Sequence, residues 1–412
     1  MNPTIKARIE SIRRGEVPEG YKRTKIGIVP NEWVTNVTLK SICTINPKTE
    51  QLPDQFIYID LESVVDGVLV SKKIIKKSNA PSRAQRVLQV NDVIYQMVRP
   101  YQRNNYLFCH ESKCYKYVAS TGYAQLRAKC YAFLYYLINS DYFCAQVLEK
   151  CTGSNYPAIN SEDLASISIT YPKKEAEQQK IAEILAGQDR VIALKEKLLA
   201  EKQKQKKYLM QQLLTGKKRL PGFSGKWETN FLRNVCDNLD NFRKPFNRDE
   251  RAIMKGIYPY YGANGIVDYI DRYIFDETII LLAEDGGDFE NYFKKPIAQK
   301  VIGKCWVNNH AHVLRAKKDY CSEFVFYLLE HKDIRKYING TTRSKLTKED
   351  MQGILLYYPI DKKEQTAIAE ILSTADKEIE LLKKDIEQEK LKKKSLMQLL
   401  LTGIVRVDEL VS

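Results

Sequence analysis

The sequence lacks any run of 18 apolar residues, and its first sixteen residues contain no apolar core of the kind found in signal peptides. A membrane-spanning helix needs about 20 such residues, and a secretory signal needs a shorter apolar core near its N-terminus. The nine cysteines are scattered and include no zinc-type CxxC pair. Reduced thiols in a cytoplasm are the simplest interpretation. We therefore expect a soluble cytoplasmic protein that contacts no membrane.

Catalytic signatures are also missing. The chain has no GxxxxGK(S/T) loop, no GxGxxG after a strand and no Asn/Asp-Pro-Pro-Tyr/Phe motif. ATPases and dinucleotide-binding enzymes need the first two, and amino-methyltransferases need the third. Of the four histidines, His310 and His312 lie at strand spacing, but no carboxylate or cysteine accompanies them at ligand spacing. We therefore predict no catalytic residue and no metal site in this chain.

Acidic residues are the scarcer charged type. The chain has 51 Asp and Glu against 66 Lys and Arg, a net charge of +15 over 412 residues. This length is enough for two or three domains. The positive excess favours a polyanionic partner, nucleic acid before membrane.

The most informative feature is an internal duplication. Residues 177–216 and 364–403 align without a gap at an offset of 187, and 20 of the 40 positions are identical. Neither stretch contains proline, and each has apolar residues close to a heptad spacing. Gly216 and Gly403 follow the last periodic leucines, where a helix C-cap glycine belongs. Each stretch is therefore predicted to be one helix of roughly 50–55 Å.

A helix of this length cannot bury its apolar stripe alone. We expect the two helices to pair with each other as an antiparallel coiled coil; the alternative is that each packs only on its local domain. The helices are also the expected docking surface for partners, because two similar units can present two near-equivalent faces. The residues predicted for pairing and docking are Ile181, Ile184, Leu185, Ile192, Leu209, Leu213, Ile368, Ile371, Leu372, Ile379, Leu396 and Leu400.

The remaining sequence divides into two globular segments. Each follows a Gly/Pro-containing lead-in that ends in a tryptophan, Trp33 or Trp227, and mixed strand and helix patterns favour α+β domains. The segments resemble each other only near their ends, which suggests a common scaffold that carries two specificities. The predicted boundaries are an N-terminal amphipathic segment 1–20, a first domain 21–173, a first helix 174–216, a second domain 217–360 and a second helix 361–412.

Both segments carry side chains suited to nucleic acid. Arginine can read guanine, and asparagine or glutamine can read adenine, but contact with phosphate is equally expected for such residues, and the tyrosines are as readily buried. The candidates in the first segment are Arg83, Gln85, Arg86, Arg99, Gln102, Arg103, Asn104, Asn105 and Asn155. Those in the second are Tyr260, Tyr261, Asn264, Asn308, Asn309, His310, Arg343 and Lys345.

These features together resemble the specificity (S) subunit of type I restriction–modification systems. The resemblance covers essentially the whole chain. It is carried by the duplicated helix with Glu-Gln…Ile-Ala-Glu-Ile-Leu and Leu-Met-Gln-x-Leu-Leu-Thr-Gly, by the lead-in from Tyr21 to Trp33, and by residues 82–86, 260–265 and 309–312.

The resemblance implies two target-recognition domains held by the two helices, each reading half of a split site in double-stranded DNA. It implies a non-catalytic chain that binds no cofactor and recruits two methyltransferase (M) subunits, which use S-adenosylmethionine to methylate adenine at N6. Restriction (R) subunits then use ATP and Mg. The competing hypothesis is a coiled-coil scaffold for proteins, without sequence-specific DNA binding; a fused restriction–methylation enzyme is disfavoured by the missing motifs.

Overall fold

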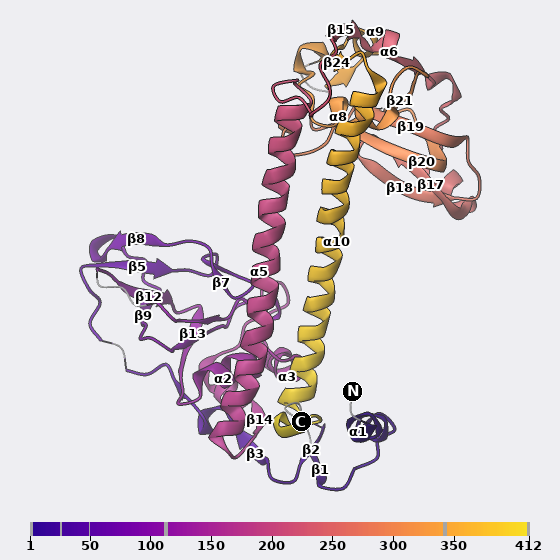
Figure 1. The fold of residues 1–412 in the computed structure, drawn as a ribbon. Helices are drawn as coiled ribbons and strands as arrows, with labels where there is room; N and C mark the ends of the chain where they lie inside the picture. Colours follow the sequence, from indigo (N-terminus) through magenta and orange to yellow (C-terminus); the bar gives the residue numbers. More distant parts are fainter. Residues whose placement is uncertain (1–2, 25–26, 49, 111–113, 341–343, 410–412) are drawn as a thin grey trace. The chain divides into compact units, whose positions relative to one another are not determined.

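The computed structural model describes residues 3–24, 27–48, 50–110, 114–340 and 344–409. The chain forms two compact units. Unit 1 comprises Met1–Lys195 and Asp385–Ser412, and unit 2 comprises Glu196–Lys384. Each contains a globular domain and part of both long helices, α5 (Glu175–Leu213) and α10 (Lys362–Leu401), which Figure 1 shows in magenta and yellow.

Unit 1 is built on two four-stranded sheets. One has the order β11 (Tyr106–Leu107), β10 (Val93–Gln96), β13 (Tyr123–Arg127) and β4 (Thr44–Ile45). The other has the order β8 (Lys73–Lys76), β5 (Gln55–Ile59), β12 (Lys116–Ser120) and β9 (Ala84–Val87), with β5 and β12 parallel. Two-stranded pairs complete it: β1 (Tyr21–Thr24) with β2 (Gly27–Pro30), β3 (Val34–Thr38) with β14 (Ser168–Tyr171), and β6 (Val64–Val65) with β7 (Val68–Leu69).

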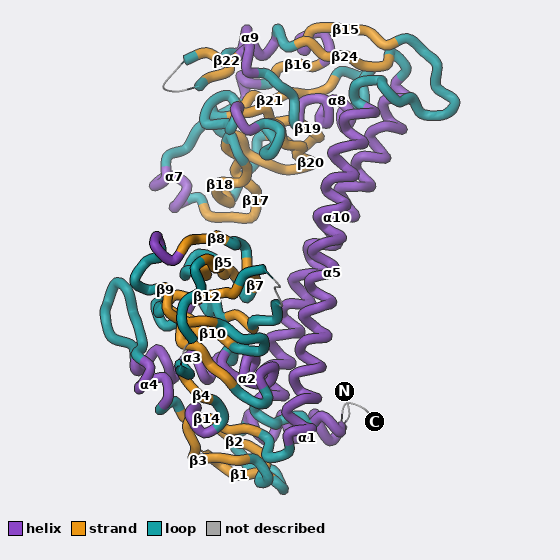
Figure 2. Tube along the Cα trace, turned by 90° about the vertical axis from the view of Figure 1, so that its left-hand side faces the viewer, coloured by secondary structure: helices purple, strands orange, loops and turns teal. Residues whose placement is uncertain are grey.

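The helices of unit 1 are α1 (Pro3–Arg13), α2 (Tyr131–Ile138), α3 (Asp141–Lys150) and α4 (Ser161–Ala165). The sequence of α2, YAFLYYLI, is apolar almost all round, so the helix is buried. Its Phe133 and Leu137 share a core cluster with Ile181 and Leu185 of α5 and with Leu400 of α10. Figure 2 shows α2 between the strands of this unit and the long helices.

Unit 2 contains one six-stranded sheet in the order β16 (Cys236–Asn238), β21 (Ala311–Ala316), β19 (Phe275–Ala283), β20 (Ala298–Val307), β17 (Lys255–Gly262) and β18 (Gly265–Ile270). Only the β17–β20 pair in it is parallel. Two-stranded pairs join β15 (Trp227–Phe231) to β24 (Leu355–Pro359) and β22 (Ile338–Asn339) to β23 (Lys345–Leu346). The helices are α6 (Leu232–Val235), α7 (Arg248–Ile253), α8 (Ser322–Glu330) and α9 (Lys348–Gln352).

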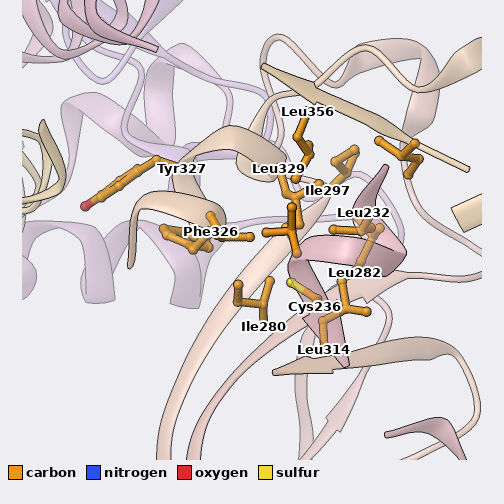
Figure 3. Packing of buried hydrophobic residues seen from close by; sticks show 14 of the residues in the cluster. Leu232, Cys236, Ile280, Leu282, Ile297, Leu314, Phe326, Tyr327, Leu329 and Leu356 are labelled. Carbon is orange, nitrogen blue, oxygen red and sulfur yellow. The ribbon is translucent and has the colours of Figure 1, made fainter. Parts of the chain in front are cut away.

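The core of unit 2 lies between the sheet, α8 and the long helices. Leu282 and Leu314 of the sheet lie near Leu329 of α8 (Figure 3). Ile368 and Leu372 of α10 belong to the same cluster. The same kind of helix therefore mediates between sheet and long helices in both units.

The duplicated scaffold is visible in the secondary structure at the offset found in the sequence. Helices α4 and α9 begin and end at positions related by that offset, and so do the starts of β14 and β24 and of α5 and α10. The caps also correspond, because the side chain of Asn160 accepts a hydrogen bond from the amide of Asp163 and that of Thr347 accepts one from Asp350. Such polar N-caps satisfy amides that a helix start leaves unpaired.

The two long helices run antiparallel within each unit. In unit 1, Lys195 of α5 forms ion pairs with Asp385 and Glu389 of α10, each at 2.8 Å. In unit 2, Lys202 pairs with Glu378 at 2.7 Å. The predicted α+β fold with an antiparallel helix pair is confirmed. The ends of each helix also pack on the local domain, so the contact that the alternative arrangement predicted is present as well.

A matching polar joint closes each unit. At the start of α5, the carboxylate of Glu177 binds Arg406; at the start of α10, that of Glu364 binds Arg219. The two glutamates are equivalent in the duplication, and so are the two arginines. In unit 1 a further hydrogen bond belongs to this joint: the hydroxyl of Tyr21 donates to the carbonyl of Gly403 at 2.9 Å. It connects the segment before Trp33 to the end of α10.

The nine cysteines form no disulfide within the described ranges of the chain. Among the described residues, no helix combines the length and the apolarity that crossing a membrane would take.

Candidate nucleic-acid interface

A cavity of about 850 Å³, lined by both polar and apolar residues, opens in unit 2 where three loops meet. Its walls come from the turn between β17 and β18, the loop that follows β19, and the turn between β20 and β21. Three predicted residues, Asn264, Asn308 and His310, line it together with Arg251 and Asp285. The structure thus brings into one site side chains that lie far apart in the sequence.

The polar atoms of these three side chains are oriented by neighbours. The amide nitrogen of Asn264 donates to the carbonyl of Gly286 at 2.8 Å, and the amide oxygen of Asn308 accepts from the backbone N–H of His310 at 2.8 Å. Nδ1 of His310 lies 2.6 Å from a carboxylate oxygen of Asp285. Because a carboxylate only accepts, we assign the proton to Nδ1.

Each side chain then keeps one atom without a hydrogen-bond partner among the residues that the structure describes: Oδ1 of Asn264, Nδ2 of Asn308 and Nε2 of His310. They offer an acceptor, a donor and, for neutral histidine, a second acceptor. Base edges in the major groove are recognised by such a set of donors and acceptors.

The cavity depends on glycine at two positions. Gly265 has φ = +134°, which other residues rarely adopt. A Cβ on Gly262 would lie 2.8 Å from Cγ2 of Val267 and 3.4 Å from Nδ2 of Asn308. Glycine at position 262 therefore leaves room for the side chain of Val267, which also lines the cavity.

A buried charge network lies close to the same loops. Asp240, Glu284 and His312 place ligand-type atoms within 4.8 Å of one another, but Arg243 reaches both carboxylates, at 3.3 and 2.6 Å. Burial alone would raise the pKa of Asp240; hydrogen bonds from His312 and other donors outweigh it, and the pKa is lowered. The Arg243 guanidinium supplies the positive charge that a cation would bring.

The other candidates of unit 2 have different positions. Tyr260 is buried, and its hydroxyl accepts from the amide of Phe246 at 2.9 Å, so its ring supports the sheet and faces no groove. Tyr261 is half-buried against a core cluster, and Asn309 is exposed beside the cavity without lining it. Lys345 is exposed and pairs with Glu284 at 3.1 Å. Arg343 lies outside the described residues.

In unit 1, the predicted loop 99–105 has an unusual backbone. Arg99 and Arg103 flank a short 3-10 turn and have φ of +54° and +52°, a region that residues with a Cβ rarely occupy. The Arg99 guanidinium lies 4.3 Å from the ring centre of Tyr156. Tyr156 is 63% exposed, and its neighbour Asn155 is exposed too. Strained residues of this kind concentrate at functional sites, and the half-buried Arg99 stacks here on an exposed ring.

The rest of the loop is bound inward. Arg103 forms an ion pair with Asp141 at 2.8 Å and donates to the carbonyl of Asn139, and Asn105 is 1% exposed with its amide nitrogen on Asn139 Oδ1 at 3.0 Å. The hydrogen bond from Arg103 lowers the pKa of Asp141. Asn105 and Arg103 therefore hold the loop in place, and the first cannot reach DNA.

Asn104 and Gln102 are also engaged, although Gln102 stays exposed. Oδ1 of Asn104 accepts from the amide of Asp66 at 3.1 Å, and Oε1 of Gln102 accepts from Gln96 at 2.9 Å. The amide of Gln102 keeps its donor nitrogen for other contacts.

The segment 82–86 forms the edge of a sheet. Arg83 and Gln85 are exposed, and Gln85 donates to the carbonyl of Ser82 at 2.8 Å. Arg86 on β9 is partly buried, burial lowers its pKa, and its Nε is buried with no partner in the described chain. Arg83 and Gln85 remain available for DNA contact.

The helix residues predicted for partner docking are mostly covered by the chain itself. Eight of the twelve are buried: Ile181, Leu185, Ile192, Leu213, Ile368, Leu372, Ile379 and Leu400. The other four are half-buried: Ile184, Leu209, Ile371 and Leu396. They pair the helices and hold the domains. The apolar side chains that stay exposed are others, notably Leu194 at 61% and Leu381 at 66%, which occupy equivalent positions in the duplication.

Sequence reasoning missed Asp285, Gly286 and Arg251 in unit 2 and Tyr156 in unit 1. The Asp-Gly-Gly run that begins two residues after the end of β19 was a usable signal, because a carboxylate and glycines near a strand end are typical of a binding loop. Arg251 and Tyr156 carried no such signal, since only the fold brings them to the site.

The comparisons with known proteins agree with this architecture. The profile of the type I restriction modification DNA specificity domain matches residues 30–203 and 224–390. A type I restriction enzyme specificity subunit from Haemophilus influenzae is 36% identical over 156 residues, which are 38% of this chain and 38% of that protein. The MjaX specificity subunit of Methanocaldococcus jannaschii is 25% identical over 419 residues, 94% of this chain and 97% of that protein.

Solved structures show the same fold. The S subunit of a type I restriction–modification system from M. genitalium matches with a TM-score of 0.60 at 16% identity, over 89% of this chain and 96% of its own. A chain from a study of complex assembly and conformational transition in the type I R-M system also matches at 0.60, with 22% identity over 92% and 99% of the two chains.

Proposed function

This chain belongs to the type I restriction–modification DNA specificity family, and from that membership we propose how its two units divide the recognition of DNA. It is a specificity subunit with two target-recognition domains, and DNA sequence recognition is its role. This excludes the protein scaffold that does not read sequence. We infer that each unit reads one half of a bipartite site and that the antiparallel helices set the separation of the halves.

In unit 2 the reading residues are Asn264, Asn308 and His310. The observation that carries this proposal is the cavity that all three residues line, each with one polar atom for which the described residues provide no hydrogen-bond partner. In unit 1 the stack of the half-buried Arg99 on the exposed Tyr156, with Arg83 and Gln85, takes the corresponding role. The excess of positive charge supplies phosphate contacts, so binding should weaken steeply with salt.

Partner subunits dock on the exposed apolar residues of the long helices. Leu194 of α5 and Leu381 of α10 are equivalent in the duplication and exposed to a similar degree. Two equivalent exposed leucines suit two copies of one partner, which we identify as the methyltransferase subunits; restriction subunits join the same complex. Leu194→Asp and Leu381→Asp should each reduce co-purification of the methyltransferase subunit, whereas Lys204→Asp on the exposed face of α5 should not.

Catalysis belongs to those partners in this proposal. S-adenosylmethionine is bound by the methyltransferase subunits, ATP and Mg are used by the restriction subunits, and this chain binds none of them. Its own contribution is to select the DNA at which adenine is methylated.

The test is a methylation map of DNA treated with the complex of this chain and its methyltransferase subunit. Asn308→Ala and His310→Ala should alter one half of the methylated motif, with about 1–3 kcal/mol less discrimination for each lost base contact. Arg99→Ala should alter only the other half. Asn309→Ala is the matched control, because it is exposed beside the cavity but does not line it. A motif that stays intact in all the cavity variants would refute the assignment.

A further inference from the structure

A three-residue contact in unit 1 connects the recognition domain to both long helices. The hydroxyl of Tyr136 on α2 donates to Oδ2 of Asp189 on α5 at 2.8 Å. The other carboxylate oxygen of Asp189 lies 2.6 Å from Nζ of Lys393 on α10. One carboxylate thus joins three separate elements.

Unit 2 contains the same contact with the two long helices exchanged. Tyr327 on α8 donates to Oδ2 of Asp376 on α10 at 2.8 Å, and Oδ1 of Asp376 lies 2.7 Å from Nζ of Lys206 on α5. In Figure 3 the Tyr327 hydroxyl is turned away from the core side chains among which its helix packs.

The two contacts combine duplicated and divergent parts of the chain. The two aspartates are equivalent in the duplication and so are the two lysines, but the tyrosines do not share that offset and come from the segments whose sequences have diverged. The domains have therefore changed around this tyrosine while its bond to the helix pair has stayed the same. Apolar packing alone would not require that, because it is non-directional.

The environment favours a directional bond. Tyr136 and Tyr327 are 5% and 2% exposed, and each lysine also lies near the tyrosine ring, at 6.0 and 5.5 Å from its centre. Burial, and then the neighbouring aspartate, raises the pKa of both phenols, so they stay protonated and donate. A hydrogen bond from a buried donor to a carboxylate is short and sensitive to geometry.

In unit 1 the same helix also holds the candidate reading loop. Asn139, three residues after Tyr136, accepts hydrogen bonds from Asn105 and Arg103. A shift of α2 along the long helices would therefore move this loop with it.

We infer that Tyr136–Asp189–Lys393 and Tyr327–Asp376–Lys206 are positioning residues that fix each recognition domain in one register along the helix pair. They thereby limit the number of base pairs tolerated between the half-sites. The inference rests on the proposed function, because it assumes that each unit reads one half-site. It adds a role for residues that touch no DNA.

The experiment uses the full chain in complex with its methyltransferase subunit. The substrates are DNA molecules with both half-sites intact and with spacers shortened or lengthened by one or two base pairs. Methylation at each altered spacer is measured relative to the native spacer. Wild type should methylate the native spacer almost exclusively, and Tyr136→Phe, Tyr327→Phe, Asp189→Ala and Asp376→Ala should each raise the relative methylation of altered spacers about tenfold, with the half-site sequences unchanged.

Matched controls lie on α5, the helix that carries Asp189. Tyr208→Phe changes a tyrosine that is 56% exposed, and Glu201→Ala removes an exposed i,i+3 pair with Lys204; both should keep the wild-type preference. If the aspartate variants fail to fold, the tyrosine variants, which remove one oxygen atom each, decide the matter. If the tyrosine variants still methylate only the native spacer and keep both half-site sequences, this inference fails and the proposed function stands. If the wild-type complex shows no preference for either half-site, the proposed function fails.

Discussion

Replacing Arg219 with alanine should destabilise unit 2 through a single buried carboxylate. The guanidinium of Arg219 binds both oxygens of Glu364, at 2.6 and 2.7 Å, and the Glu364 side chain has no exposed surface. Arg219 itself is 29% exposed and lies 5.6 Å from the ring centre of Trp227. The pair closes the start of α10 against the segment that follows α5.

The expected loss of stability follows from this difference in burial between Arg219 and Glu364. Two unit charges 4 Å apart interact by about 4 kcal/mol at an effective dielectric constant of 20, and removal of one partner from a buried pair typically costs about 3–5 kcal/mol. Because water already reaches part of Arg219, we expect the lower end, about 3 kcal/mol, for Arg219→Ala, which leaves the Glu364 carboxylate unpaired. Glu364→Gln should cost less, about 1–2 kcal/mol, because the half-exposed guanidinium that it leaves can be solvated.

The measurement is urea unfolding of both single variants and the double variant, followed by far-UV circular dichroism and by tryptophan fluorescence, to which Trp227 contributes locally. A chain with two units need not unfold in one step, so the transition that includes Trp227 is compared. The double variant should be more stable than the sum of the single effects implies, because no unpaired buried charge remains. Additive effects within about 0.5 kcal/mol would refute the reasoning. Arg406→Ala removes the equivalent pair with Glu177 and should weaken unit 1 instead.

Further predictions concern the cavity, pH and the joint of unit 1. Gly262→Ala places a Cβ 2.8 Å from Cγ2 of the exposed Val267 in the cavity wall, so that this side chain must move, and methylation mapping should show relaxed selectivity in one half-site. The pKa of Glu389 is lowered from 4.5 to about 2, chiefly by the hydrogen bond from Lys195. A carboxyl group whose pKa is lower in the folded than in the unfolded protein stabilises the fold while it is ionised. The contribution of Glu389 is therefore complete above pH 4.5 and is lost as the pH falls toward 2. The stability difference between wild type and Glu389→Gln, followed by circular dichroism in an acid titration, should therefore be present at pH 7 and absent near pH 2. Tyr21→Phe, which removes the donor to Gly403, should raise proteolysis of the segment that precedes Trp33, and an unchanged cleavage rate would contradict the role of that joint.

Much of the fold could be predicted from the duplication. In the globular segments, the apolar patterns predict strands at 56–61, 92–98 and 278–283, which overlap β5, β10 and β19, and a helix at 323–329, which lies within α8. The apolar run 131–138 fits a buried helix or a buried strand by its pattern alone, and in the structure it is the helix α2. The long helices were the most predictable elements, because a repeated apolar period without proline specifies a helix regardless of tertiary context.

The candidate sites were less predictable, for a physical reason. Residue type identifies which side chains are able to contact DNA, but the fold decides which of them are free to do so. Asn105 and Asn264 are chemically identical, yet the first is enclosed against Asn139 and the second stands at the wall of a cavity. The same holds for the leucines and isoleucines of the helices, where the heptad positions are covered by the chain itself and Leu194 and Leu381 are left exposed.

Two kinds of polar contact are repeated in the two units, and this constrains how the units can differ. The joints Glu177–Arg406 and Glu364–Arg219, and the aspartate–lysine pairs at Asp189 and Asp376, all keep the offset of the duplication. Apolar cores tolerate substitution when volume is conserved, whereas a buried charge requires its partner at one position. A recognition domain can therefore change its sheet and its reading loops as long as it presents a tyrosine to the helices and leaves the joint intact. The unit would then keep its attachment while its specificity changes, which is the pattern seen between the two halves of this chain.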